Sequence, residues 1–184
     1  IGPSTRRTGL IISEIMYHPK AKSDGRNLEF IEIYNSQENI ENLSGYTLSG
    51  AVDFTFPGGA FIQPKAYLVV AAVPDAVKVI YGLNLVYGPF VGSLANGSGT
   101  IRLNNAQGAV LLEAQYGSDG AWPVAPDGTG HSLVLARPSY GEADPRAWAS
   151  SESINGSPGR AETPGTNPFR AVVINEFLAH TDDP

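Results

Sequence analysis

The chain has 184 residues and no Cys, and its 12 Lys and Arg against 18 Asp and Glu give a formal net charge of −6. The missing Cys excludes disulfides, thiolate metal sites and a Cys nucleophile, and the acidic balance argues against sequence-independent binding to nucleic acid. No apolar run approaches the ~18 residues that a membrane-spanning helix requires, so no membrane span is predicted.

The first predicted elements form an opening hairpin. Residues 10–17 and residues 28–34 are apolar, β-prone runs, and the polar connector between them contains Pro19, Asp24 and Gly25. Apolar side chains alternate onto both faces of the second run, which is typical of a strand covered on both sides. The second run is therefore predicted to be a central strand.

One short helix is predicted, over residues 74–81. Pro74 and Asp75 stand at its start and Gly82 follows its end, which are favoured positions for these residues at helix termini. The apolar residues have helical spacing, so the helix is expected to lie over one end of a sheet.

The clearest later hairpin joins residues 100–103 to residues 109–116 through a loop rich in Asn and Gly. Residues 131–136 are predicted to be the last strand of the unit, and residues 137–166 are predicted to be irregular, with Trp148 as their main anchor. Strands that are short, separated by turn residues and not alternating with helices indicate an all-β sandwich or barrel.

An ordered set of segments resembles the lamin tail domain family, in its bacterial branch. The segments are residues 12–16 (ISEIM), 30–35 (FIEIYN), 42–48 (NLSGYTL), 54–57 (FTFP), 64–70 (PKAYLVV), 92–97 (GSLANG), 101–103 (IRL), 108–110 (GAV), 122–123 (WP), 127–133 (DGTGHSL) and 155–159 (NGSPG). The resemblance implies an immunoglobulin-like β-sandwich of short antiparallel strands with one short helix. It also implies structural roles for Glu32, Asn35, Gly45, Pro123 and Gly130, which match the family pattern.

This resemblance suggests a division of the chain. Residues 1–9 are predicted to be an N-terminal linker, and residues 10–160 the lamin-tail-like domain. Residues 161–184 are predicted to be a linker and the first strand of a truncated second copy, because residues 173–180 (VINEFLAH) echo the first strand. An unpaired apolar strand is a template for assembly, so residues 172–178, from Val172 to Leu178, are predicted to mediate self-association.

Four acidic residues of the opening hairpin are candidate calcium ligands: Glu14, Asp24, Glu29 and Glu32. Carboxylate oxygens suit Ca²⁺, but a calcium site needs 6–8 converging oxygens, so the alternative is that these acids are solvated or bond to turn backbone. For Glu32 and Asn35, bonding to neighbouring backbone is the preferred interpretation. No other cofactor is predicted.

Two tryptophans are candidate binding residues. Trp122 and Trp148 could stack against a sugar beside Asp127, although isolated loop tryptophans more commonly close the ends of a sandwich. The run from Gly130 to Ser132 approaches a nucleophile elbow but lacks its last Gly and lies in a strand, so a hydrolase is not favoured.

These patterns favour a non-catalytic β-sandwich module of an exported multidomain bacterial protein, secreted or at the cell surface, that mediates protein–protein or surface interaction. The alternative is a carbohydrate- or calcium-binding accessory module of a larger enzyme. An enzyme domain would require a pocket with strongly shifted titratable groups, and no catalytic constellation is visible in the sequence.

Overall fold

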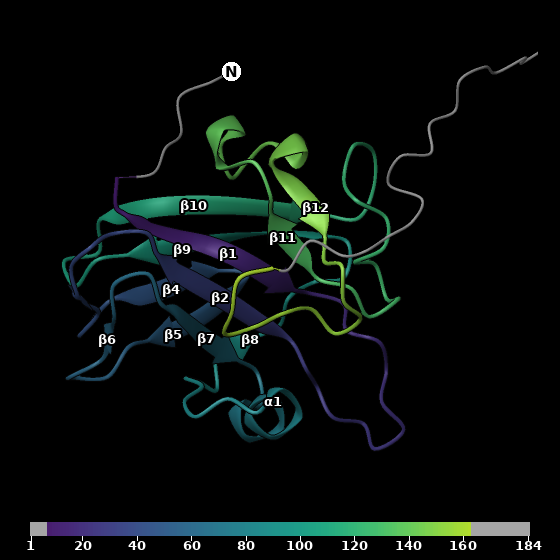
Figure 1. Cartoon of the computed structure of the whole chain (residues 1–184), viewed down its shortest axis with the longest axis horizontal. Coiled ribbons are helices and arrows are strands. Elements are labelled where there is room, and N and C mark those ends of the chain that lie inside the picture. The colour runs from purple at the N-terminus through teal and green to yellow at the C-terminus, as the bar shows by residue number, and fades with distance from the viewer. Residues whose placement is uncertain (1–6, 163–184) are drawn as a thin grey trace, which may run out of the picture.

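Two five-stranded antiparallel sheets face each other in the computed structural model, which describes residues 7–162 (Figure 1). The β1 sheet has the spatial order β12 (Trp148–Ser150), β11 (Leu133–Leu135), β1 (Leu10–Met16), β2 (Phe30–Asn35) and β7 (Tyr67–Ala71). The β9 sheet has the order β10 (Val110–Gly117), β9 (Ser98–Asn104), β4 (Thr47–Gly50), β5 (Val52–Thr55) and β8 (Val91–Gly92).

Smaller elements complete the described part of the chain. They are the two-stranded sheet of β3 (Glu41–Asn42) and β6 (Phe61–Ile62), the helix α1 (Pro74–Tyr81), and two 3₁₀ turns at Pro138–Tyr140 and Pro145–Ala147. The all-β, immunoglobulin-like sandwich with one short helix is confirmed.

The opening hairpin is also confirmed, because β1 and β2 pair antiparallel. β2 lies between β1 and β7, and apart from Tyr34 its residues are buried, as expected for a central strand covered on both faces. The second predicted hairpin forms as β9 and β10. The main core lies between the two sheets and includes Ile33 and Ile101, which are fully buried.

A β-bulge at Ser13 decides where the acid of β1 points. The register passes from Ile12 opposite Ile33 to Glu14 opposite Glu32, so Ser13 is an extra residue in β1. A bulge of this kind reverses which side chains face the core. Ile12 before the bulge and Ile15 after it therefore both face the core, and Glu14 turns to the outer face of the sheet.

The helix α1 begins and ends where predicted, and Gly82 ends it in the left-handed conformation with φ 66°. It covers one end of the outer face of the β1 sheet, where Val77 packs in a second core with Met16 and Phe30 (Figure 1). The placement over one end of a sheet is confirmed.

A matched pair of helix variants tests this second core. Val77 is fully buried and Val79, two residues later, is 76% exposed. Val77→Ala is expected to lower the free energy of unfolding by about 2 kcal/mol, because it leaves a cavity, and Val79→Ala by less than about 0.5 kcal/mol. Chemical denaturation measures both, and equal effects would show that α1 does not pack as described.

One strand prediction is wrong. Residues 137–166 were expected to be irregular after a last strand at residues 131–136, but β12 pairs antiparallel with β11 inside that region. The strand has three residues, which is too short for alternation to be recognised in the sequence. Trp148, its first residue, is 3% exposed and does anchor the region, donating its indole N–H to Glu142 O at 3.0 Å.

Candidate functional site

The strongest concentration of unusual chemistry lies on the outer face of the β1 sheet. Glu14 and Glu32 are directly opposite each other on β1 and β2, and each is 1% exposed. Their strands place them between two apolar regions: Met16 and Phe30 lie under α1 on one side, and Tyr34 lies on the other. The sequence placed the two acids on adjacent strands but did not show that both are buried.

The chain that follows β12 covers this pair. Residues 157–162, here called the strap, cross in front of the β1 sheet as the yellow trace in Figure 1. The backbone N–H of Ser157 donates to Glu14 Oε1 at 2.9 Å, and the backbone N–H of Gly159 donates to Glu32 Oε2 at 2.6 Å. The strap therefore satisfies buried carboxyl oxygens with its own backbone.

Side-chain hydroxyls complete the hydrogen bonding. Ser132, which directly precedes β11, also donates its hydroxyl to Glu14 Oε1. The Ser157 hydroxyl lies 3.4 Å from Glu14 Oε2. Ser13, the bulge residue, donates to Glu32 Oε1 at 2.6 Å. All four carboxyl oxygens of the pair consequently have a protein partner.

Burial favours the neutral form of both acids. Removal from water raises the pKa of Glu14 to about 7. The same effect, followed by the charge of Glu14, raises the pKa of Glu32 to about 8. Two negative charges side by side in this position would be largely removed from water and would repel each other, so the pair is expected to hold protons up to neutral pH.

A pocket of about 240 Å³ opens beside the pair. It is lined by Ile11, Ser13, Glu14, Glu32, Tyr34, Tyr67, Val134, Leu135, Pro138, Ser157, Arg160 and Glu162. Glu162, a strap residue, accepts from the Ser157 hydroxyl at 2.7 Å. Nothing in the sequence connects Ser157, Arg160 or Glu162 with the opening hairpin, because they lie more than a hundred residues away and follow no periodic pattern.

The other two calcium candidates lie apart from the pair. Asp24 accepts from the Arg26 guanidinium at 2.6 Å, and Glu29 accepts from the backbone N–H of Leu94 at 3.1 Å. Within residues 7–162, no group of three or more His, Asp or Glu is arranged to hold a metal ion. Calcium binding stays a prediction, with Glu14 and Glu32 as the candidates that the fold brings together.

The three predicted binding residues, Trp122, Asp127 and Trp148, differ in how far they are buried. Trp148 is buried in the core, and Trp122 is half-buried and packs against it. Asp127 is exposed and accepts from His18 Nδ1 at 2.6 Å. Of the three residues predicted to bind a sugar, Asp127 and part of Trp122 therefore lie at the surface.

Three residues of the family pattern lie at the end of a strand or in loops: Asn35 ends β2, and Gly45 and Gly130 lie in loops. Asn35 donates its side-chain amide to Asn39 O at 2.8 Å and to Gln63 O at 3.1 Å, so it ties two loops to the end of β2. Gly45 and Gly130 have φ of 76° and 98°, in the left-handed region where a β-carbon is strained. The roles of these residues are therefore structural. Glu32 also has such a role, because it accepts the backbone N–H of Gly159.

The chain belongs to the lamin tail domain family, whose profile matches residues 3–118. This family consists of non-catalytic immunoglobulin-like domains, which agrees with the sandwich. No curated protein matches the chain. β11, β12 and the strap all lie beyond the matched residues, so the cover of the carboxyl pair comes from outside the family match.

No helix in residues 7–162 is both long enough and apolar enough to cross a lipid bilayer.

Proposed function

We propose that this chain is a non-catalytic interaction module of an exported multidomain bacterial protein, and that it binds protein through an apolar patch around β6. The observation that carries this proposal is the exposure of three large apolar side chains there. Ile40 is 58% exposed, Phe61 is 50% exposed and Leu85 is 60% exposed. Exposed apolar groups that gather in one place commonly mark an interaction site.

Phe61 stands between two depressions of the surface. One, of about 340 Å³, is lined by Ile40, Asn42, Ser44, Gly59, Ala60, Phe61 and Gln63. The other, of about 210 Å³, is lined by Phe61, Ile62, Gln63, Ala66, Tyr67, Leu68, Leu85 and Tyr87. Neither depression has a charged lining residue, which suits an apolar segment of another chain.

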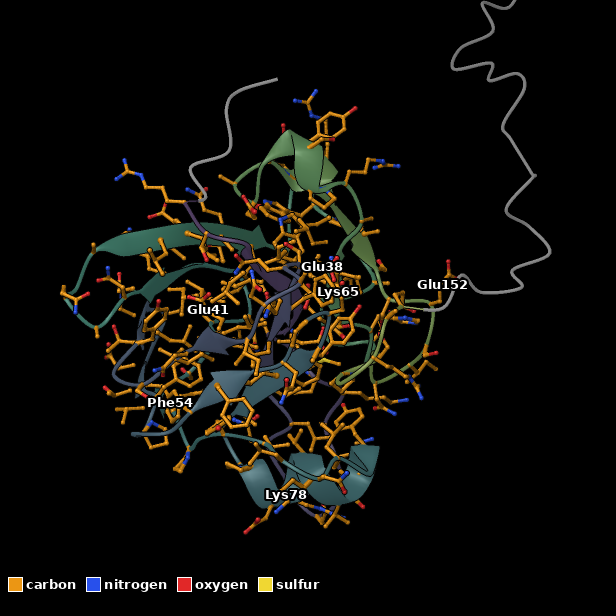
Figure 2. The ribbon with its side chains drawn as sticks, turned by 60° about the vertical axis from the view of Figure 1, so that its left-hand side comes forward. Glu38, Glu41, Phe54, Lys65, Lys78 and Glu152 are labelled. Carbon is orange, nitrogen blue, oxygen red and sulfur yellow. The ribbon has the colours of Figure 1, made fainter. Side chains whose placement is uncertain are left out.

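Charged residues lie at the border of this patch. Glu38 lies two residues before Ile40, and Lys65 lies in the turn that follows β6. The two form an ion pair with Nζ 3.0 Å from Oε1 and lie together in Figure 2. An apolar centre with a charged rim is the usual arrangement of a protein-binding surface.

Catalysis at the carboxyl pair is a weaker proposal. Shifted titratable groups beside a pocket are what an enzyme domain would require. Glu14 and Glu32, however, are covered by the strap, and their oxygens are taken up by Ser13, Ser132, Ser157 and Gly159. The alternative is an accessory module that binds carbohydrate or calcium. Of the two tryptophans predicted to stack against a sugar, only Trp122 is partly exposed, and no further contact supports this alternative.

The occupant we propose for the patch is residues 172–178 of a second copy of this chain. These residues lie outside the part of the chain that the structure describes. Their sequence, VVINEFL, is apolar with a single acid, and the uncharged lining of the patch is complementary to it. Nine residues separate them from the end of the strap, enough to span about 30 Å if extended, so they can reach a neighbouring molecule.

Sedimentation velocity across a range of concentrations tests this assignment. The parent chain is expected to self-associate, while Phe61→Asp and a deletion of residues 168–184 are each expected to remain monomeric, because burying a charge or removing the segment abolishes the contact. Val79→Asp, which adds the same charge to the exposed face of α1, is the matched control and should associate like the parent. Identical behaviour of all four proteins would rule out self-association through this patch.

A further inference from the structure

The strap is held to the β1 sheet by hydrogen bonds that converge on the Glu14–Glu32 pair. Three hydrogen bonds, from Ser157 N, Ser157 Oγ and Gly159 N, reach the carboxyl groups of Glu14 and Glu32. Two further bonds are internal to the strap, from Arg160 N to Ser157 O and from the Ser157 hydroxyl to Glu162, and at its far end Glu162 accepts the backbone N–H of Glu152 at 3.0 Å. The bonds that hold residues 157–159 to the β1 sheet therefore end on two carboxyl groups.

The residue before Gly156 is fixed independently of these carboxyls. Asn155 donates its backbone N–H to Gly130 O at 2.6 Å, and its carbonyl accepts from the Tyr81 hydroxyl at 2.8 Å. Its side chain also accepts from Lys22 Nζ at 3.2 Å. Gly156 follows with φ 79°, a conformation that glycine leaves and enters without steric cost, so any movement of the strap would start there.

We propose that residues 157–162 form a latch, closed over the outer face of the β1 sheet while Glu14 and Glu32 are neutral and opened from Gly156 when both ionise. Ionised carboxyls require more hydration than neutral ones, and the strap covers the pair on the side where Ser157 and Gly159 bond to it. Opening the strap hydrates both groups and leaves the strand pairing of the sandwich intact. Such opening is the least disruptive way for the protein to accommodate the two charges.

The charged groups around the pair also favour opening of the strap when Glu14 and Glu32 ionise. The groups that face the pair are Glu162 and Arg160 from the strap, Tyr34 and Tyr67 from the strands, and Tyr81 from α1. Glu162 adds a third carboxyl to the two buried ones, whereas Arg160 is the single cation that lines the pocket. Ionisation of the pair thus creates like-charge repulsion that one guanidinium does not balance.

Thermodynamic linkage connects the two events. Burial raises the pKa of both acids and outweighs the hydrogen bonds from Ser157 and Gly159, which lower it, so protonation stabilises the covered state and ionisation destabilises it. The raised values place this change between neutral and mildly alkaline pH, well above the range in which ordinary surface carboxyls titrate.

Distance measurement between two spin labels tests the latch in the intact chain. The chain has no Cys, so labels can be placed specifically at Ala161→Cys on the strap and at Val79→Cys on α1, both at exposed positions. We expect one narrow distance distribution at pH 6 and a broad one, extended to longer distances, at pH 9.5. Far-UV circular dichroism should be the same at both pH values.

The control is the same labelled pair in Glu14→Gln/Glu32→Gln, which cannot ionise and should give the narrow distribution throughout. If this variant does not fold, Glu32→Gln alone should broaden less than the parent at pH 9.5. A parent distribution that stays narrow at pH 9.5 overturns the proposal, as does loss of the far-UV signal, which would mean global unfolding instead of a local opening. A Gln variant that opens as fully as the parent overturns it as well.

Discussion

Gly156→Ala is expected to lower the free energy of unfolding by about 3 kcal/mol, because a backbone cost and a steric cost add. Gly156 has φ 79°, where an L-residue costs about 1–2 kcal/mol. A β-carbon there would also overlap Glu14 Oε1 and lie 2.7 Å from Ser132 Oγ. The buried carboxyl cannot move away without losing its hydrogen bonds, so the backbone cost and the steric cost add.

Gly120→Ala separates these two costs. Gly120 has a similar φ of 62°, but a β-carbon there would meet nothing within 4 Å. This variant should lose only about 1 kcal/mol, from the backbone alone. Urea denaturation of both variants gives the comparison, and equal losses would mean that Gly156 is not packed against the carboxyl pair.

Stability is expected to decrease by about 2–4 kcal/mol between pH 5 and pH 8.5. Glu14 and Glu32 have pKa values of about 7 and about 8 in the folded chain, against 4.5 for an ordinary glutamate. Between pH 4.5 and pH 8 the folded state therefore binds more protons than the unfolded state, and the free energy of unfolding falls as the pH rises. Each group alone contributes up to about 1.4 kcal/mol per pH unit, and local opening limits the total.

Glu14→Gln/Glu32→Gln should remove this slope, because an amide keeps the shape and the acceptor oxygen of a neutral carboxyl and does not ionise. The remaining titratable groups, including His18 and His131, are the same in both proteins, so their contribution cancels in the comparison. Denaturation series at the two pH values measure the slope. A parent chain that is equally stable at both, or more stable at pH 8.5, contradicts the burial of neutral carboxyls.

Features with a local cause could be predicted from the sequence. Pro74 and Gly82 mark the ends of α1 to the residue, because their backbone preferences act without help from the rest of the fold. The loop at residues 104–108 likewise specifies the hairpin of β9 and β10. The pairing of β1 with β2, and with it the proximity of Glu14 to Glu32, followed from two apolar runs separated by a turn-rich connector.

Features that depend on distant contacts could not be predicted. The strap has no apolar periodicity, and its bonds to Glu32 and Glu14 span 127 and 143 residues of sequence. The sequence therefore offered the four acids as candidate calcium ligands, with bonding to backbone preferred for Glu32, and did not show that the fold buries Glu14 and Glu32 under the strap. The bulge at Ser13, which turns Glu14 outward, is equally invisible, since it is defined by the register of the partner strand.

The match to the family profile does not cover the whole β1 sheet. It ends at residue 118, yet β11 pairs with β1 and β12 pairs with β11, so the β1 sheet is completed by residues beyond the match. The strap continues that same stretch. The residues that cover the carboxyl pair thus lie beyond the matched range.

Carboxyl ¹³C NMR of the glutamate side chains, followed from pH 3 to pH 10, tests this account most directly. The resonances of Glu14 and Glu32, assigned with the two single Gln variants, are expected to titrate near neutral pH or above, since both groups are buried and neutral beneath the strap. Exposed glutamates in the same spectra serve as the internal reference. Titration of Glu14 and Glu32 together with those exposed groups would contradict the account.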